Sequence, residues 1–435
     1  MFRSPFSTLF LLFWPVSIAL PQVLTGAPTR TVFVIFALVA LGETLLSSSR
    51  AIFSRSVGRP VYLIFLTLVC SLAIMISRSV LNAHGWPIED SARIGLAVST
   101  FLLFVVLALI LVFSNNDADS RNKLNFSLMS IPILITFNII VAVVIGFKSY
   151  NIGNTNRSEL LAALGIDVVR LSELPGIYGA NSIGGVCCVG IIVSLYMTFR
   201  SRMIGKAFWG LVTILNISCL LWTDARSFLV WALVGAIIMG IGSVVKRYLS
   251  YSALMFSAVS SAFLPSIFNW LEGSALSGLL VRGTEQGEKL GVGTGRDQLW
   301  QAAFNVLSNF SDKQILGYGM LGQYNGGISM VDVRFVFTGE SDFPHLHNTF
   351  LQNLFDIGYV GAVLLIIVSL MTIFFLTDDG SSEYKLPISI FFILLISSAT
   401  ESSIGVYNLY LYGVFLAVVL YAVSFTRRPT DIGNV

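Results

Sequence analysis

Charged residues are scarce in this chain of 435 residues. Asp, Glu, Lys and Arg together make up 11% of it, whereas apolar residues make up 55% and the mean hydropathy is +0.82. Soluble domains carry about 25% charged residues, so this composition excludes an ordinary soluble protein. The apolar segments run for about 20 residues without polar alternation, which indicates membrane helices rather than a transmembrane barrel. The predicted fold class is therefore an all-α polytopic membrane protein.

Cysteine, histidine and net charge are low as well. The four cysteines (Cys70, Cys187, Cys188 and Cys219) all fall in apolar segments, which disfavours a disulfide framework or a structural zinc site. The net charge of +3 is too small to suggest nucleic acid as a partner. There are only three histidines, and beyond His84 no further histidine or external cysteine supports a metal site at His345 and His347. We therefore predict no metal and no cofactor.

The apolar segments number about twelve. The first of them follows Arg3 like a signal peptide but lacks a clear small-x-small cleavage site, so we interpret it as a membrane helix. The predicted membrane helices are 6–25, 30–46, 61–80, 94–113, 127–147, 177–199, 207–222, 227–245, 250–270, 349–376, 386–401 and 405–425.

Lysine and arginine placement predicts the orientation. With a cytoplasmic N-terminus, fourteen basic residues fall in inner segments and seven in short outer loops, which predicts that both termini are cytoplasmic. The inner set is Arg3, Arg50, Arg55, Arg59, Arg121, Lys123, Arg200, Arg202, Lys206, Lys246, Arg247, Lys385, Arg427 and Arg428, and the outer set is Arg30, Arg78, Arg93, Lys148, Arg157, Arg170 and Arg226.

One outer loop, residues 271–348, is too long to be a simple connector, which suggests a functional loop. Within it, residues 297–310 place Leu299, Trp300, Ala303, Phe304, Leu307 and Phe310 on one helical face. This pattern predicts a short amphipathic helix that either lies on the outer membrane surface or packs on the helix bundle.

Two arginines on the outer side are candidates for binding an anion. Arg226 lies in the short turn TDARS between two apolar segments, where an arginine is either a snorkelling anchor or a ligand for an anionic group. Arg296 ends the glycine run GVGTGR, and Thr294 and Asp297 give a weak capping pattern that would put Arg296 in the first helical turn. Free backbone N–H groups and a guanidinium fork suit phosphate oxygens.

His347 lies just before an expected helix start. Thr349 and Gln352 give a capping-box pattern, so the helix is expected to begin near Thr349, and the helix dipole there disfavours a protonated imidazole. A neutral histidine that faces an anionic substrate is a candidate general base. The alternative is a polar cap at the membrane interface. Glu43 and Glu401 are further candidates, for proton relay in a transporter, although Glu401 fits an interfacial cap better.

Topology adds to these separate signals. Arg226, Arg296 and His347 come from distant parts of the chain, and all three are predicted on the outer face. If they converge, they form a cationic site with one base, which suits an anionic lipid-linked donor.

At these residues the chain resembles the bacterial O-antigen ligase and polymerase superfamily of membrane glycosyltransferases. The motif His-Asn-x-x-Leu-x-x-Leu followed by Gly-x-x-Gly appears as HNTFLQNLFDIGYVG, Gly-Arg-x-x-x-Trp as GRDQLW, Gly-Tyr-Gly as ILGYG, and the short arginine turn as TDARS. The resemblance covers about residues 205–425. It divides the chain into an N-terminal transmembrane bundle (1–204), the ligase-like region (205–425) and a cytoplasmic tail (426–435). Two departures are Asp356, where the family often has glutamate, and Asp224 beside the first arginine.

The resemblance implies a GT-C-like fold and transfer of a glycan from an undecaprenyl diphosphate-linked donor, on the periplasmic face of the bacterial inner membrane. Arg226 and Arg296 would then hold the diphosphate, and His347 would deprotonate or orient the acceptor hydroxyl, with His345 and Asn348 in support. Transfer would be metal-independent and would invert the anomeric configuration. The implied acceptor is lipid A-core for a ligase or another lipid-linked glycan for a polymerase, and a chain-length regulator protein is a further implied partner.

Two other classes of function are compatible with a polytopic chain. A secondary transporter or lipid flippase would need paired charges or broken helices near the bilayer midplane, in related halves. A non-catalytic membrane scaffold would not need the converging cations.

Overall fold

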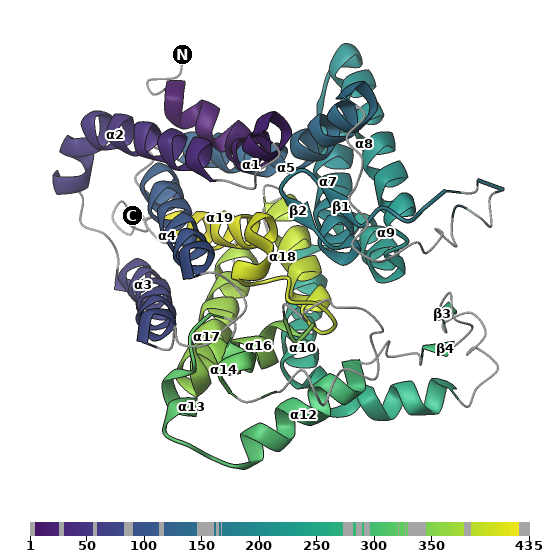
Figure 1. The fold of residues 1–435 in the computed structure, drawn as a ribbon. Helices are drawn as coiled ribbons and strands as arrows, with labels where there is room; N and C mark the ends of the chain where they lie inside the picture. Colours follow the sequence, from purple (N-terminus) through teal and green to yellow (C-terminus); the bar gives the residue numbers. More distant parts are fainter. Residues whose placement is uncertain are drawn as a thin grey trace.

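Helices form almost the whole of the described structure, a computed structural model (Figure 1). It describes residues 5–25, 30–54, 59–81, 90–112, 117–145, 161, 165–166, 168–272, 282–283, 289–290, 296–320, 322–326, 328, 345–377 and 384–425. The predicted tail 426–435 lies outside these residues, as do segments 273–281, 284–288, 291–295 and 329–344 of the predicted outer loop and His84.

The long helices follow the order of the apolar segments. They are α1 (Pro5–Thr25), α2 (Thr31–Ser54), α3 (Arg59–Leu81), α4 (Asp90–Val112), α5 (Asp117–Ile145), α7 (Ala180–Arg200), α8 (Met203–Thr223), α9 (Arg226–Gly240), α10 (Ser243–Glu272), α17 (Gly358–Thr377), α18 (Lys385–Ser397) and α19 (Leu409–Phe425).

The connecting segments contain short elements. These are the helices α12 (Arg296–Ser308), α13 (Lys313–Leu316), α14 (Gly322–Asn325) and α16 (Thr349–Asp356), the 3-10 helix η2 (Val406–Asn408), and two antiparallel strand pairs, β1 (Glu173–Leu174) with β2 (Ile177–Tyr178) and β3 (Arg282–Gly283) with β4 (Lys289–Leu290).

Five helical segments of the described chain are long and apolar enough to cross a membrane: Pro5–Val23, Asp119–Val144, Ala180–Arg200, Met203–Thr223 and Gly358–Thr377. Shorter apolar helices cover Thr31–Leu46, Thr67–Ser79, Ala97–Val112, Arg226–Gly240, Lys385–Ser397 and Leu409–Ser424. The all-α polytopic class is thus supported, whereas the count of twelve spans and the outer position of the long loop stay predictions.

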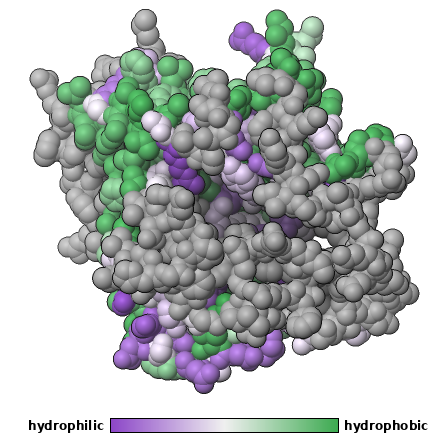
Figure 2. Space-filling model, viewed as in Figure 1, coloured by the Kyte–Doolittle hydropathy of each residue, from purple (hydrophilic) through white to green (hydrophobic). Residues whose placement is uncertain are grey.

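Apolar packing holds the bundle around α7 and α19. Cys187, Cys188 and Cys219 are fully or almost fully buried in this core, and Cys70 is exposed. All four thiols are free, and the three buried ones pack as small apolar side chains, as the sequence predicted. Figure 2 shows apolar residues gathered over the part of the molecule that holds α1, α2 and α8.

The amphipathic helix α12 packs on the bundle. Leu299, Trp300 and Ala303 are buried in a second apolar cluster that also contains Leu346 of the histidine segment and Leu264 of α10. This settles the open alternative in favour of packing rather than lying free on a membrane surface. Phe310, which the pattern placed on the same face, is 63% exposed, because the helix ends at Ser308.

The expected single helix 349–376 is wrong. It is two helices, α16 and α17, because Ile357 leaves the helical region (φ −126°, ψ 9°) and Gly358 has φ +70°. At only eight residues, α16 is too short to cross a bilayer. The break lets the backbone of Gly358 approach that of residues 314–317 closely, where a Cβ on Gly358 would lie 2.4 Å from Gly317 N.

The break generates a stability prediction. Gly358→Ala places a side chain where backbone atoms already lie and forces a positive φ on alanine, so we expect a loss of about 2 kcal/mol and a lower melting temperature of the purified protein in detergent. The matched control is Gly210→Ala in α8, where nothing lies within 4 Å of the added Cβ. Equal melting temperatures for the two variants would show that the break at Gly358 does not require glycine.

Candidate functional site

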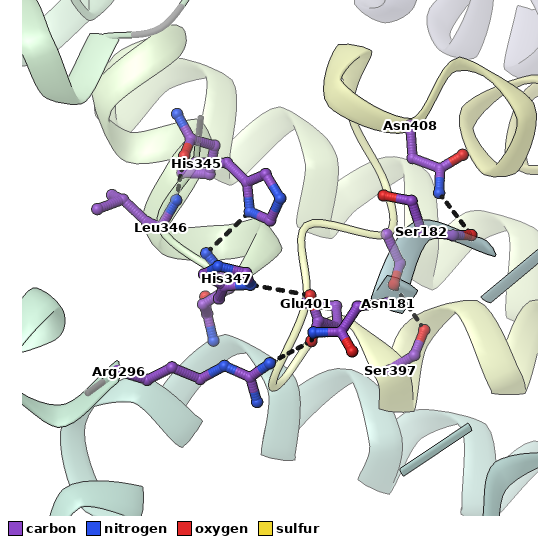
Figure 3. Close-up of polar contacts among 12 residues, drawn as sticks. Asn181, Ser182, Arg296, His345, Leu346, His347, Ser397, Glu401 and Asn408 are labelled. Atoms are coloured by element: carbon purple, nitrogen blue, oxygen red, sulfur yellow. Dashed lines mark hydrogen bonds and ion pairs between the residues drawn. The ribbon is translucent and has the colours of Figure 1, made fainter. Parts of the chain in front are cut away.

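A buried carboxylate joins three separate parts of the chain (Figure 3). Glu401 follows α18, and its side chain is 6% exposed. Its Oε1 pairs with Nη2 of Arg296, the first residue of α12, and accepts a hydrogen bond of 2.7 Å from Asn181 Nδ2 of α7. Its Oε2 lies 3.0 Å from Nδ1 of His347, which precedes α16. The structure thus brings Arg296 and His347 together on one carboxylate.

Glu401 is ionised at neutral pH in this setting. Burial by itself would raise the pKa of the carboxyl group, but the charge of Arg296 and the contact with His347 outweigh burial and lower the pKa to about 2. An ionised carboxylate only accepts hydrogen bonds, and here it accepts them from a guanidinium, an imidazole and an amide.

The contact with Glu401 determines which imidazole nitrogen of His347 is basic. Because the ionised carboxylate can only accept, Nδ1 carries the proton in this contact, and the neutral ring then has its lone pair on Nε2. The carboxylate also fixes the orientation of the ring and would stabilise an imidazolium formed on proton uptake. In this arrangement the carboxylate positions the imidazole and leaves Nε2 as its hydrogen-bond acceptor.

His345 supports the backbone of His347. Its Nδ1 accepts a hydrogen bond of 3.2 Å from His347 N, and its ring lies 4.2 Å from the His347 ring and 5.7 Å from the Tyr407 ring, centroid to centroid. Burial, together with the nearby His347 and Arg296, lowers the pKa of His345 to about 3. His345 is therefore neutral at neutral pH and adds no charge to the site.

Asn348 anchors the same segment from the other side. It is fully buried and is the N-cap of α16, where its Oδ1 accepts from Leu351 N at 2.8 Å. Its Nδ2 donates to Ser260 Oγ and to Ala399 O. The helix does begin at Thr349, as predicted, but the expected capping box between Thr349 and Gln352 is wrong because the cap is Asn348.

Helix α12 carries both a site residue and an anchor. Arg296 and Trp300 are four positions apart and therefore lie on one helical face. The fully buried Trp300 donates from Nε1 to Leu346 O at 2.7 Å, between the two histidines. Leu346 N in turn donates to Gln352 Oε1 at 2.7 Å. The spacing Gly-Arg-x-x-x-Trp thus places the guanidinium at Glu401 while the indole holds the histidine segment.

The Gly-Tyr-Gly motif brings another backbone against the end of α16. Tyr318 N donates to Phe355 O at 2.7 Å, and Gly319 N donates to Asp356 O at 2.9 Å. Gly317 has φ +76°, and a Cβ there would lie 2.5 Å from Gly358 N. Gly319 has φ +89°, and a Cβ there would lie 2.5 Å from Ser79 N, so both glycines of the motif allow close approach of another backbone.

Asp356 is the centre of a second buried network. Its carboxylate accepts from Gly322 N, Gln352 Nε2 and Tyr407 Oη, at 2.9 to 3.0 Å. Burial raises the pKa of Asp356 to about 7, although these hydrogen bonds oppose the rise. Tyr407 also lines a small polar cavity beside Glu401, together with Asn181, Ser182 and His345. The second network thus borders the site.

Arg226 is the first residue of α9. Its Nε lies 3.4 Å from Oδ1 of the buried Asp224, which is the pairing that the sequence suggested. Phe228, two residues later, lines the same small cavity as Glu401 and His345. Whether Arg226 shares a ligand with Arg296 therefore stays a prediction.

Sequence reasoning missed Glu401 and Asn181 as parts of the site. The sequence favours an interfacial cap for Glu401, but the structure shows that its carboxylate accepts from three side chains of distant segments. The available signal was an acidic residue at the end of an apolar segment. The sequence could not show its partners, which lie 54, 105 and 220 positions away along the chain.

No group of three or more His, Cys, Asp or Glu residues that could hold a metal ion occurs in the described part of the chain.

Comparison with known proteins identifies the segment that carries most of this site. Residues 211–366 match the family model described as O-antigen ligase. This segment is similar to the O-antigen ligase family. This match supports the resemblance to the O-antigen ligase and polymerase superfamily, and the matched segment includes Arg226, Arg296 and His347. No curated protein and no solved structure matched the chain.

The raised pKa of Asp356 makes a pH-dependent prediction. Between pH 3.8, the ordinary pKa of an aspartate, and about pH 7, Asp356 is protonated in the folded protein but ionised in the unfolded chain. Stability from this group is therefore present below about pH 4 and is lost as the pH rises toward 7. Relative to wild type, Asp356→Asn should gain about 3 kcal/mol between pH 4.5 and pH 7.5.

Thermal unfolding in detergent across this pH range measures the difference. The matched control is Asp312→Asn at the exposed start of α13. A stability difference between Asp356→Asn and wild type that stays constant with pH would contradict the assignment of a proton to Asp356.

Proposed function

We propose that this protein is a membrane glycosyltransferase that moves a glycan from an undecaprenyl diphosphate-linked donor to a sugar hydroxyl on the periplasmic face. It would act as ligase or polymerase in the synthesis of a surface polysaccharide such as O-antigen, capsule or exopolysaccharide. The observation that carries the proposal is the joining of Arg296 and His347 by Glu401, largely within a segment that matches the O-antigen ligase family.

In the proposed reaction, His347 is the general base. The acceptor hydroxyl oxygen attacks the anomeric carbon of the donor, its proton passes to Nε2 of His347, and the bond from that carbon to the diphosphate oxygen breaks. Glu401 holds the ring through Nδ1 and stabilises the imidazolium. Attack from the face opposite to the leaving group inverts the anomeric configuration.

Arg296 and Arg226 would stabilise the leaving diphosphate. A guanidinium has five N–H donors, so the pairing of Arg296 with Glu401 leaves donors for phosphate oxygens. Arg226, the first residue of α9, has a side chain that is 31% exposed. Two guanidinium groups can supply the positive charge that a divalent ion supplies in other transferases, so we propose a metal-independent reaction.

An apolar cavity beside the site would hold the polyprenyl chain of the donor. It is lined by α3, α17 and α19, through residues such as Leu68, Leu72, Leu365 and Phe415, and its polar end includes Asp356. Asp356 accepts from Tyr407, which lines the polar cavity beside Glu401. This continuity suits a lipid whose chain lies among membrane helices and whose head group lies at the polar site.

The positions of basic residues support the proposed orientation. Helix α7 has Asn181 at Glu401 and Arg200 at its other end, and Arg247 near the start of α10 donates to Thr377 at the end of α17. These basic residues belong to the predicted cytoplasmic set and lie away from Glu401. Under the positive-inside rule, Glu401 and His347 would then face the periplasm, with both termini cytoplasmic and the chain in the bacterial inner membrane.

The position of the site favours a transferase over a transporter or flippase. The Glu401 cluster lies beyond the end of α18 and before the start of α16, whereas transporter sites lie near the bilayer midplane between broken helices.

The genetic test uses a deletion strain complemented with variants. We expect His347→Ala to abolish the polymerised or ligated glycan while the protein stays inserted, since no other group takes the acceptor proton. His84→Ala, the third histidine of the sequence, is the matched control and should restore the glycan. The measurement is the size distribution of lipid-linked and surface glycan on a gel.

The same gel separates the two proposed activities. Accumulated single lipid-linked repeat units in the deletion strain indicate a polymerase, and long lipid-linked chains that are not attached to core indicate a ligase. Normal surface glycan in the His347→Ala strain would contradict the general-base role, and normal glycan in the deletion strain would contradict the proposed function.

The apolar cavity gives a separate prediction. Ser71→Trp on α3 fills the cavity, so with purified protein we expect KM for an undecaprenyl diphosphate-linked donor to rise about tenfold, with little change for a donor on a short, three-isoprene chain. The matched control is Cys70→Trp, which changes the neighbouring exposed residue. A similar rise in KM for both chain lengths would argue against this cavity as the site of the polyprenyl chain.

A further inference from the structure

A cationic cavity lies far from Glu401, at the opposite end of the bundle. Its volume is about 290 Å³, larger than that of the two cavities near the site. The residues that line it come from the start of α5 and the end of α7, and they are Arg121, Asn122, Asn125, Tyr196, Met197 and Arg200. The proposed reaction uses none of them.

Helix α7 fixes the distance between this cavity and the candidate site. Asn181, in its first turn, donates to Glu401, and Arg200 is its last residue. Nineteen residues of α-helix span about 29 Å, which is close to the thickness of the hydrocarbon core of a bilayer. If Glu401 lies at one membrane face, the cavity therefore lies at the other.

The arginine from α7 is held in place at the cavity. Arg200 Nη1 donates to Tyr196 Oη at 2.6 Å, and the Arg200 guanidinium lies over the Tyr196 ring, 5.4 Å from its centroid. These two contacts to Tyr196 already restrict the Arg200 side chain, so Arg200 loses less conformational entropy when it binds a ligand.

The lining of the cavity suits an anion. It combines two arginines and two asparagines with no acidic residue. Asp119, an acidic residue two positions before Arg121 on the same helix, pairs with Lys123 at 2.8 Å. Guanidinium forks and side-chain amides are the donors that hold phosphate oxygens in proteins.

The position of the cavity selects among phosphate ligands. It lies at the ends of two segments that are long and apolar enough to span a membrane, Asp119–Val144 and Ala180–Arg200, which is where lipid head groups lie. Tyrosine is enriched at this level, and basic pockets between membrane helices bind anionic head groups. Met197 supplies an apolar edge for the start of an acyl chain.

We propose that the cavity formed by the start of α5 and the end of α7 binds the phosphodiester head group of an anionic phospholipid. The site lies at the membrane face opposite Glu401. A lipid bound there would contact both α5 and α7 and so would stabilise their packing. This effect does not depend on the reaction that the protein performs.

The test measures lipid binding by the purified full chain in detergent. Phosphatidylglycerol, phosphatidylcholine and inorganic phosphate are the three probes, and native mass spectrometry counts the bound lipids. We expect wild type to retain phosphatidylglycerol over phosphatidylcholine, and the double variant Arg121→Ala, Arg200→Ala to lose at least tenfold in phosphatidylglycerol affinity. Arg202→Ala, two positions after Arg200 and not part of the lining, is the matched control and should bind as wild type does.

Two further measurements keep the outcome decisive. Asn125→Leu retains both arginines, so its weaker binding would support the site even if the double variant does not fold. The proposal would be overturned if the double variant retained phosphatidylglycerol as well as wild type does. If the double variant does not fold, the same result for Asn125→Leu would overturn it. Competition by inorganic phosphate at the same concentration as the lipid would overturn the lipid assignment and indicate a site for soluble phosphate.

Discussion

The charge of Glu401 is the constraint on which the candidate site depends. A buried carboxylate without partners costs several kcal/mol, and removing one partner of a buried pair is strongly destabilising. In this chain the partners come from α7, α12 and the segment before α16, which are far apart in the sequence. One buried charge therefore holds together three segments that apolar packing alone would not fix in register. The same charge sets the tautomer of His347 and limits how Arg296 can meet a ligand.

The surrounding motifs work mainly through the backbone. Trp300 holds Leu346 between the two histidines, and Asn348 fixes the start of α16 against α10 and the end of α18. The glycines at 317 and 358 allow two backbones to approach within a distance that a Cβ would forbid. Catalytic precision of the proposed kind requires such support, because a base displaced by about 1 Å loses much of its effect. These contacts of the motif residues thus position the segment that carries His347.

Much of the fold could be predicted from the sequence. Apolar runs gave the positions of the long helices, and the pattern over 297–310 gave the helix α12 with Leu299, Trp300 and Ala303 buried. The break at Gly358 was not predicted, because the local sequence does not show that the backbone of residues 314–317 packs against Gly358. Arg296, His347 and their neighbours could be selected by residue type and position. Their partner Glu401 could not, since a lone acidic residue does not reveal which distant cations it will meet.

The most direct test of the link between Glu401 and His347 is a double-mutant cycle for glycan transfer by the purified protein. Suppose that Glu401 acts by orienting the ring of His347 and stabilising the imidazolium. Then Glu401→Gln should lower the rate of transfer only slightly in a protein that already carries His347→Ala. The account predicts that the rate of the double variant lies within about threefold of the slower single variant, because residues that act as a unit are not additive. If the fold-decrease in rate of the double variant equals the product of the two single-variant decreases, the two residues act separately. That result would contradict the account.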